Sequence, residues 1–137
     1  CQRWVNTQES SASGLTVLEV TIPTGYVIQQ QELDLIVKTT SLSNLEEARH
    51  YDRKVVFYFD YLDINPTCIS FTVQRWYPVA NLTRYIPVRV YDYYAPERFN
   101  ETMFNTQNLY YLSVCHVCAS YQCPYCPIFS GTLNLTP

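Results

Sequence analysis

An alternation of apolar and polar residues in the second half of the chain most strongly limits how the chain can fold. In the segment Arg84–Tyr94, Val88 and Val90 alternate with Arg89 and Tyr91. A period of two is typical of a strand that buries one face. A proline follows the segment, and proline cannot donate to a sheet ladder. The segment therefore predicts a β-sheet protein.

Other segments have the same character, because they are rich in β-branched and aromatic residues or alternate in polarity. We expect strands at Cys1–Val5, Leu15–Ile22, Lys54–Phe59, Cys68–Arg75 and Phe99–Phe104. The third of these follows a predicted turn at residues 52–53, so residues 50–51 should pair with it as a hairpin. The side chains expected to face the core are Val55, Phe57, Phe59, Ile69, Phe71 and Val73. Residues 6–14 and 41–49 are expected to be loops.

One segment changes period. In Gln29–Lys38, the apolar residues Leu33, Ile36 and Val37 share one face of a helix. Many short strands with one inserted helix predict an all-β fold, an antiparallel β-sandwich. We expect this sandwich to occupy residues 1–110 and a disulfide-rich C-terminal tail to occupy residues 111–137.

Composition excludes several functions. A chain of 137 residues can form one domain that buries about 68% of its unfolded surface. The net charge of −3, without a Lys/Arg cluster, argues against nucleic-acid binding.

No apolar run approaches the roughly 20 residues of a membrane span, so we expect no direct membrane insertion. The N-terminus has no signal-peptide pattern, and a first residue Cys1 suggests a fragment of a longer precursor or a processed mature chain.

Cysteines and sequons predict a secreted, extracellular glycoprotein. Six cysteines in a short chain fit an oxidising compartment. Three Asn-x-Ser/Thr sequons begin at Asn81, Asn100 and Asn134. Asn81 precedes the long strand and Asn100 follows the turn at Pro96, so we expect both to be exposed and glycosylated.

Two Cys-x-x-Cys units lie near the C-terminus. Their four thiolates could bind zinc or an iron–sulfur cluster. Only four residues separate the units, however, whereas zinc ribbons usually have about 15–20. In an oxidising compartment two disulfides are the favoured state, preferably between the units, although sequence does not set the connectivity. The four residues are Cys115, Cys118, Cys123 and Cys126.

Cys1 and Cys68 remain as the third pair. If their strands are neighbours, a bridge between them closes a loop of about 67 residues, which chain-entropy models value at roughly 4 kcal/mol. We expect this bridge to be structural.

Catalysis has little support. His50 and His116 are the only histidines, and neither belongs to a recognisable nucleophile motif. The carboxylate pairs at 46–47 and 60–63 lie beside turns, where charges are usually solvated. We therefore expect no enzyme activity, no cofactor and no metal. Tyr91, Tyr93 and Tyr94 could form a binding face, but tyrosines that alternate on a sandwich are more often structural.

Three blocks of sequence resemble one known family in the same order. They are Leu15–Val20 with Thr24–Tyr26 and the helix, Val55–Asp60, and Val90–Tyr94. The chain resembles the C-terminal receptor-binding, macroglobulin-like domain of the α2-macroglobulin and complement thioester-protein family. The resemblance covers roughly residues 4–104 and implies a β-sandwich with one crossing helix. The cysteine-rich tail is similar to that of membrane-anchored and invertebrate members.

The resemblance implies a non-enzymatic recognition domain of a secreted protein that traps proteases or acts as an innate-immune opsonin. Its partners would be other domains of the same precursor and a cell-surface receptor. The family's thioester sequence is absent here and belongs to a different domain of that family. The alternative is a structural extracellular module that mediates multimer or matrix assembly.

The helix departs from plasma α2-macroglobulins, which carry two lysines there for binding to lipoprotein-receptor-related clearance receptors. Those receptors hold lysine ammonium groups in acidic, calcium-bound pockets. The matching positions fall near Gln30 and Asp34, Lys38 lies beyond them, and Glu32 adds repulsion. The resemblance therefore implies that any receptor binds through a lysine-independent surface.

Overall fold

The structure is a computed structural model that describes residues 1–76, 85–106 and 115. Its strands and single helix, in chain order, are β1 (Thr16–Thr21), β2 (Tyr26–Val27), α1 (Gln30–Thr39), β3 (Leu45–Tyr51), β4 (Lys54–Phe59), β5 (Gln74–Arg75), β6 (Tyr85–Asp92) and β7 (Phe99–Asn105). The described part is thus all-β and antiparallel with one inserted helix, which confirms the predicted fold class.

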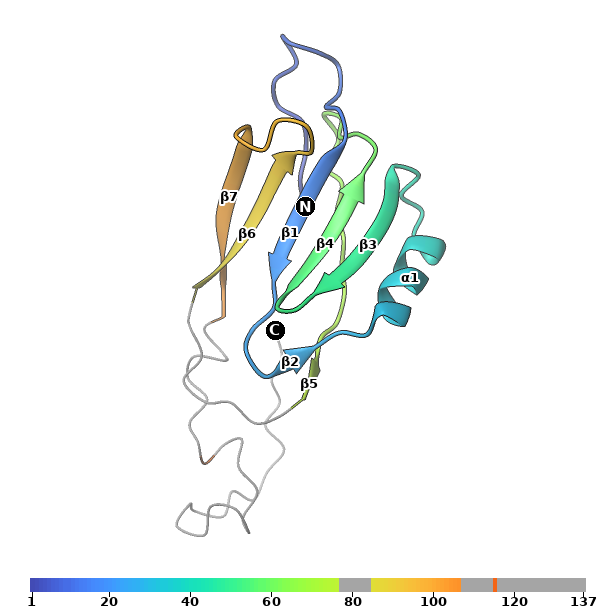
Figure 1. Cartoon of the computed structure of the whole chain (residues 1–137). Coiled ribbons are helices and arrows are strands. Elements are labelled where there is room, and N and C mark those ends of the chain that lie inside the picture. The colour runs from blue at the N-terminus through green and yellow to red at the C-terminus, as the bar shows by residue number, and fades with distance from the viewer. Residues whose placement is uncertain (77–84, 107–114, 116–137) are drawn as a thin grey trace.

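Five of the strands form one antiparallel sheet in the order β3-β4-β1-β6-β7 (Figure 1). Strand β1 pairs with β4 and β6, so the segment after the N-terminal loop lies at the centre of the sheet. The two outer strands among the described residues are β3 and β7. Strands β2 and β5 form a separate two-stranded sheet.

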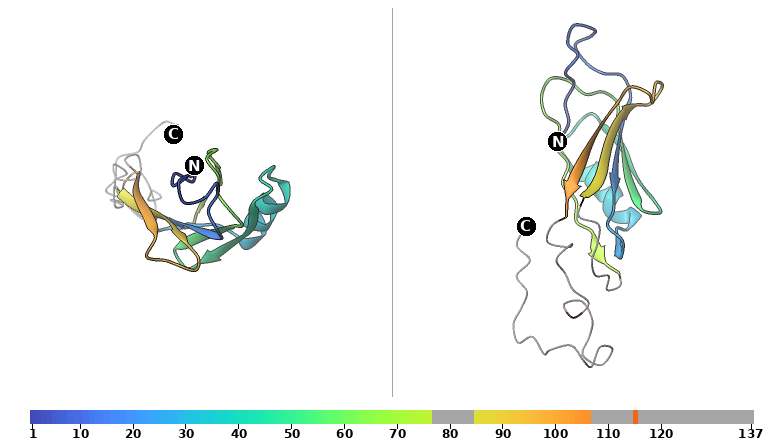
Figure 2. Two further views of the ribbon diagram at one scale, coloured as in Figure 1. Left: turned by 90° about the horizontal axis from the view of Figure 1, so that it is seen from above. Right: turned by 90° about the vertical axis from the view of Figure 1, so that its left-hand side faces the viewer.

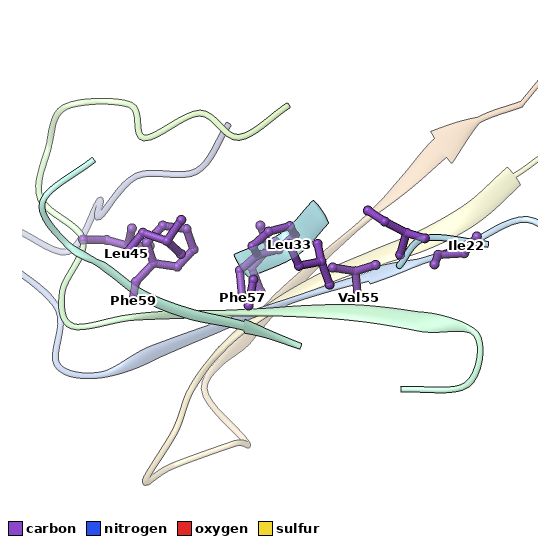
Figure 3. Packing of buried hydrophobic residues seen from close by; sticks show 10 residues of the cluster. Ile22, Leu33, Leu45, Val55, Phe57 and Phe59 are labelled. Atoms are coloured by element: carbon purple, nitrogen blue, oxygen red, sulfur yellow. The ribbon is translucent and has the colours of Figure 1, made fainter. Parts of the chain in front are cut away.

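The core lies on the concave face of the curved sheet, where Figure 2 shows the N-terminal segment crossing it. Val55, Phe57 and Phe59 of β4 are fully buried, as the alternation of β4 predicts. Figure 3 shows Val55 and Phe57 beside Leu33 of α1, and Phe59 beside Leu45. The partly buried side chains that cover this cluster include Trp4, Ile69, Phe71 and Val73.

Three local predictions were wrong in whole or in part. The loop expected at 41–49 contains the start of β3 at Leu45. A bulge between Leu45 and Glu47 and the charged pair at 46–47 hid this edge strand, because both interrupt the alternation. The segment 1–5 forms only one bridge, from Gln2 to Thr67, and of the strand expected at 68–75 only β5 is paired. The interior contacts expected of that segment still form, without a ladder.

The remaining predicted elements are confirmed within a few residues at their ends. The hairpin of β3 and β4 turns at Asp52, whose φ of 45° is a left-handed conformation that Asp tolerates better than most residues. No helix in the described ranges is long and apolar enough to cross a membrane.

Candidate functional site

Helix α1 carries the residues that the sequence identifies as a candidate interaction surface. Leu33 is 0% exposed in the core, and Ile36 and Val37 pack against the same cluster. Their spacing of three and four places them on one face, so the helix is anchored through that face. The helix lies beside the outer strand β3 (Figure 1).

The side chain of Gln30 is hydrogen-bonded to the backbone of β3. Its Nε2 donates to the carbonyl oxygen of Ala48 at 2.8 Å, and its Oε1 accepts from the backbone N–H of His50 at 3.0 Å. In a parallel pair of strands, one residue bonds to the carbonyl and the amide of two residues that are two positions apart on its neighbour. The carboxamide of Gln30 makes the same two bonds, to the carbonyl of Ala48 and the amide of His50. We call this pair of hydrogen bonds the Gln30 bridge. The carboxamide closes part of the sheet edge, and both of its polar atoms are used in hydrogen bonds to β3, although Gln30 itself is exposed.

The other two candidate positions on α1 remain at the surface. Asp34 is exposed and its Oδ1 accepts from Gln30 Nε2 at 2.9 Å. Lys38 is exposed in the last turn, where a cation is favourable to the helix dipole, and no described residue forms an ion pair with it. Glu32 in the first turn accepts from Gln74 Nε2 at 3.2 Å. Helix α1 therefore carries one lysine, Lys38, that has no ion pair with any residue that the structure describes, and two carboxylates, Glu32 and Asp34.

The convex face of the sheet carries a second polar network. The hydroxyl of Tyr91 donates to Glu19 Oε1 at 2.9 Å, and Lys54 Nζ lies 3.3 Å from Glu19 Oε2. Burial, and then the hydrogen bond to Glu19, raise the pKa of Tyr91 to about 12. The network joins β6, β1 and β4, so Tyr91 has a structural role.

The tyrosines nearby divide into two groups. Burial, and then a hydrogen bond with Tyr51, raise the pKa of Tyr58 to about 12. Tyr93 packs against Tyr58 with ring centroids 6.4 Å apart, and Tyr94 packs edge-on against Tyr93 at 5.1 Å. Tyr93 and Tyr94 are 48% and 82% exposed. These two tyrosines remain accessible to a partner.

The predicted disulfide between Cys1 and Cys68 is confirmed. It joins the N-terminal segment to the segment after residue 62. Cys115 is also disulfide-bonded, and no described cysteine is free. Several other predicted residues lie outside the described part of the chain, namely Asn81, His116, Cys118, Cys123, Cys126 and Asn134.

Asn100 lies on β7, opposite Val90 of β6, and is exposed. His50 lies on β3, with its Nε2 2.9 Å from the carbonyl oxygen of Asp52 at the hairpin turn. Among the residues that the structure describes, no three His, Cys, Asp or Glu side chains gather as metal ligands would.

Comparison with known proteins shows the family. The model of the A-macroglobulin receptor binding domain matches residues 11–105, so the chain belongs to this family of receptor-binding domains. Among curated relatives, thioester-containing protein 1 of Anopheles gambiae matches over 127 residues, with 29% identity for alleles S3 and S1 and 28% for allele R1. The match covers 90% of this chain but 9% of each relative.

The Gln30 bridge is the feature of the site that the sequence did not predict. Its partners are 18 and 20 residues away on a strand that was expected to be a loop. The polar spacing of Gln30 and Asp34 signalled only an exposed helical face. The contact depends on β3 forming, so local periodicity carries no signal for it.

Proposed function

We propose that this chain is a non-enzymatic recognition domain of a secreted thioester-containing protein, occupying residues 1–110 with a cysteine-rich tail at 111–137. The parent protein would trap proteases or act as an opsonin in innate immunity. The domain would contact other domains of the same precursor and, after a change of shape in the parent, a cell-surface receptor. The receptor-binding family and the thioester-containing relatives support this proposal.

We further propose that the receptor contact is independent of lysines on α1. The observation that carries this proposal is the Gln30 bridge, because one of the two positions that bear lysine in plasma α2-macroglobulins is used here to bind β3. The other position is Asp34, whose charge opposes an acidic, calcium-loaded receptor pocket. Lys38 remains, but a single lysine does not supply the pair of ammonium groups that such receptors bind.

The test is surface binding of the chain to a lipoprotein-receptor-related ectodomain in the presence of calcium. We expect no binding at micromolar concentrations, for the parent chain and for Lys38→Ala alike. The variant Asp34→Lys serves as a positive probe, because it creates a lysine pair with Lys38 one turn apart without disturbing the bonds from Gln30 to β3. Micromolar binding by the parent chain that is lost in Lys38→Ala would refute lysine independence.

A further inference from the structure

The outer strand β7 is exposed along its whole length. All seven of its residues are exposed, and Phe99, Met103 and Phe104 are each more than half exposed. No described strand pairs with the outer side of β7. An exposed apolar edge strand is a template for pairing with another chain.

Strand β7 has few of the devices by which proteins block such pairing. It contains no proline and no lysine, and its register with β6 runs from Phe99 to Asn105 without a bulge. Its single charge is Glu101, which lies opposite Arg89 of β6. The guanidinium of Arg89 stacks on Phe99, 4.1 Å from the ring centroid, so the convex side of the edge is flat and aromatic.

The concave side of the edge borders a hollow. A cavity of about 750 Å³ is lined by Val88 and Val90 of β6 and by Asn100, Thr102 and Phe104 of β7. The cavity also touches Glu101 and Met103, so the strand alternation decides the side. Asn100 and Thr102 are two residues apart on β7 and pair with Val90 and Val88, so they lie on the concave side with these valines. They are the first and third residues of the sequon Asn100-Glu101-Thr102.

We propose that an N-linked glycan on Asn100 covers the outer edge of β7 and the mouth of the cavity, and so prevents strand-to-strand association of this domain. The glycan is hydrophilic and bulky, and Asn100 lies next to the end of β7 where Phe99 is exposed. An incoming strand that paired with β7 would have to displace it. This inference rests on the secreted location in the proposed function.

The experiment uses the chain secreted from a eukaryotic cell. Thr102→Ala removes the sequon, and Thr102→Ser is its matched control because serine keeps the sequon. Asn81→Gln is a second control that removes a different sequon. We expect Thr102→Ala to self-associate at about tenfold lower protein concentration than Thr102→Ser, a difference of ~1.4 kcal/mol in association free energy. Light scattering after size exclusion measures this.

A third variant locates the contact. Adding Met103→Lys to Thr102→Ala places a lysine on the convex side of the same edge, and lysine is a common blocker of edge pairing. We expect the double variant to be monomeric. Persistent association of the double variant, or equal behaviour of Thr102→Ala and Thr102→Ser, would overturn the proposal.

Mass spectrometry separates failure of this inference from failure of the proposed function. A glycan on Asn81 with Asn100 bare would overturn the inference and leave the secreted location intact. Both asparagines bare would overturn the inference and also contradict secretion.

Discussion

The two edges of the five-stranded sheet are closed in different ways. At β3, a helix packs beside the edge and Gln30 binds the carbonyl of Ala48 and the amide of His50. This edge also carries a bulge and the charged residues Glu46, Glu47 and Arg49. At β7, the described part of the chain supplies one charge and a sequon. One edge is thus closed by the fold, and we propose that the other is closed by a modification.

The difference bears on the proposed receptor contact, because Gln30, one of the two positions compared with the lysines of plasma α2-macroglobulins, is hydrogen-bonded to β3. Substituting a side chain that makes two hydrogen bonds to a strand lowers stability, whereas substituting an exposed residue of an edge strand changes stability little. Mutations at the two edges should therefore separate stability from association.

Removing the anchor of the helix should give the largest effect. Leu33 is fully buried between α1 and the sheet, whereas Met103 of β7 is 55% exposed. We expect Leu33→Ala to lower the free energy of unfolding by about 3 kcal/mol and Met103→Ala to change it by less than about 0.5 kcal/mol. Urea unfolding followed by fluorescence measures both. Similar losses of unfolding free energy in Leu33→Ala and Met103→Ala would contradict the difference proposed between the β3 and β7 edges.

Breaking the Gln30 bridge should have the next largest effect. Gln30→Ala leaves two edge groups of β3 without their partners, and we expect a loss of about 1–2 kcal/mol. Gln30→Glu should also destabilise, because a carboxylate oxygen then faces the carbonyl of Ala48. Gln31→Ala is the control, since Gln31 is exposed on the same helix. Equal midpoints for Gln30→Ala and Gln31→Ala in urea would contradict a structural role for the bridge.

The centre of the sheet should show a pH dependence. The pKa of Tyr91 rises from 10.0 to about 12 on folding, so its contribution to stability is complete below pH 10 and is lost as pH rises toward 12. Tyr91→Phe should lose the hydrogen bond to Glu19, and its stability should therefore fall less steeply between pH 10 and pH 12. The urea midpoint measured at several pH values tests this, with Tyr94→Phe as an exposed control. A decline that is unchanged in Tyr91→Phe would argue against the network.

The smallest effect should come from the sequon on β7. Thr102→Ala, measured at concentrations where the chain is monomeric, should change the free energy of unfolding by less than about 0.5 kcal/mol, as most exposed substitutions do. The glycan is proposed to act on association, so the two edges should respond in different assays. A loss of several times this size would assign the glycan to folding instead.

The sequence predicted the elements whose alternation is regular. Strands β1, β4 and β6 each keep one face apolar or a clear run of β-branched and aromatic residues, and α1 has its apolar spacing. The edge strand β3 was missed because a bulge and paired charges break the pattern. The alternation of apolar residues predicts strands at residues 1–5 and 68–75, which cover the core. Apart from the bridge of Gln2 with Thr67 and the short strand β5, their backbone pairs with no described strand.

The candidate site was predictable only in part. Residues 30, 34 and 38 were placed correctly on one helix, and the disulfide of Cys1 with Cys68 was expected. The role of Gln30 depends on a tertiary contact between α1 and β3, which local sequence does not encode. The position of Asn100 at the rim of a cavity follows from the pairing of β7 with β6, not from its sequon.

The most direct test of this account is amide hydrogen exchange at His50, resolved by NMR, in the parent chain, Gln30→Ala and Gln31→Ala. The backbone N–H of His50 donates to Gln30 Oε1 at 3.0 Å. We expect its exchange to accelerate about tenfold in Gln30→Ala, the equivalent of ~1.4 kcal/mol, with no change in Gln31→Ala or in the amides of β7. If His50 exchanges at the same rate in all three chains, the Gln30 bridge does not close the β3 edge, and position 30 is free for a receptor.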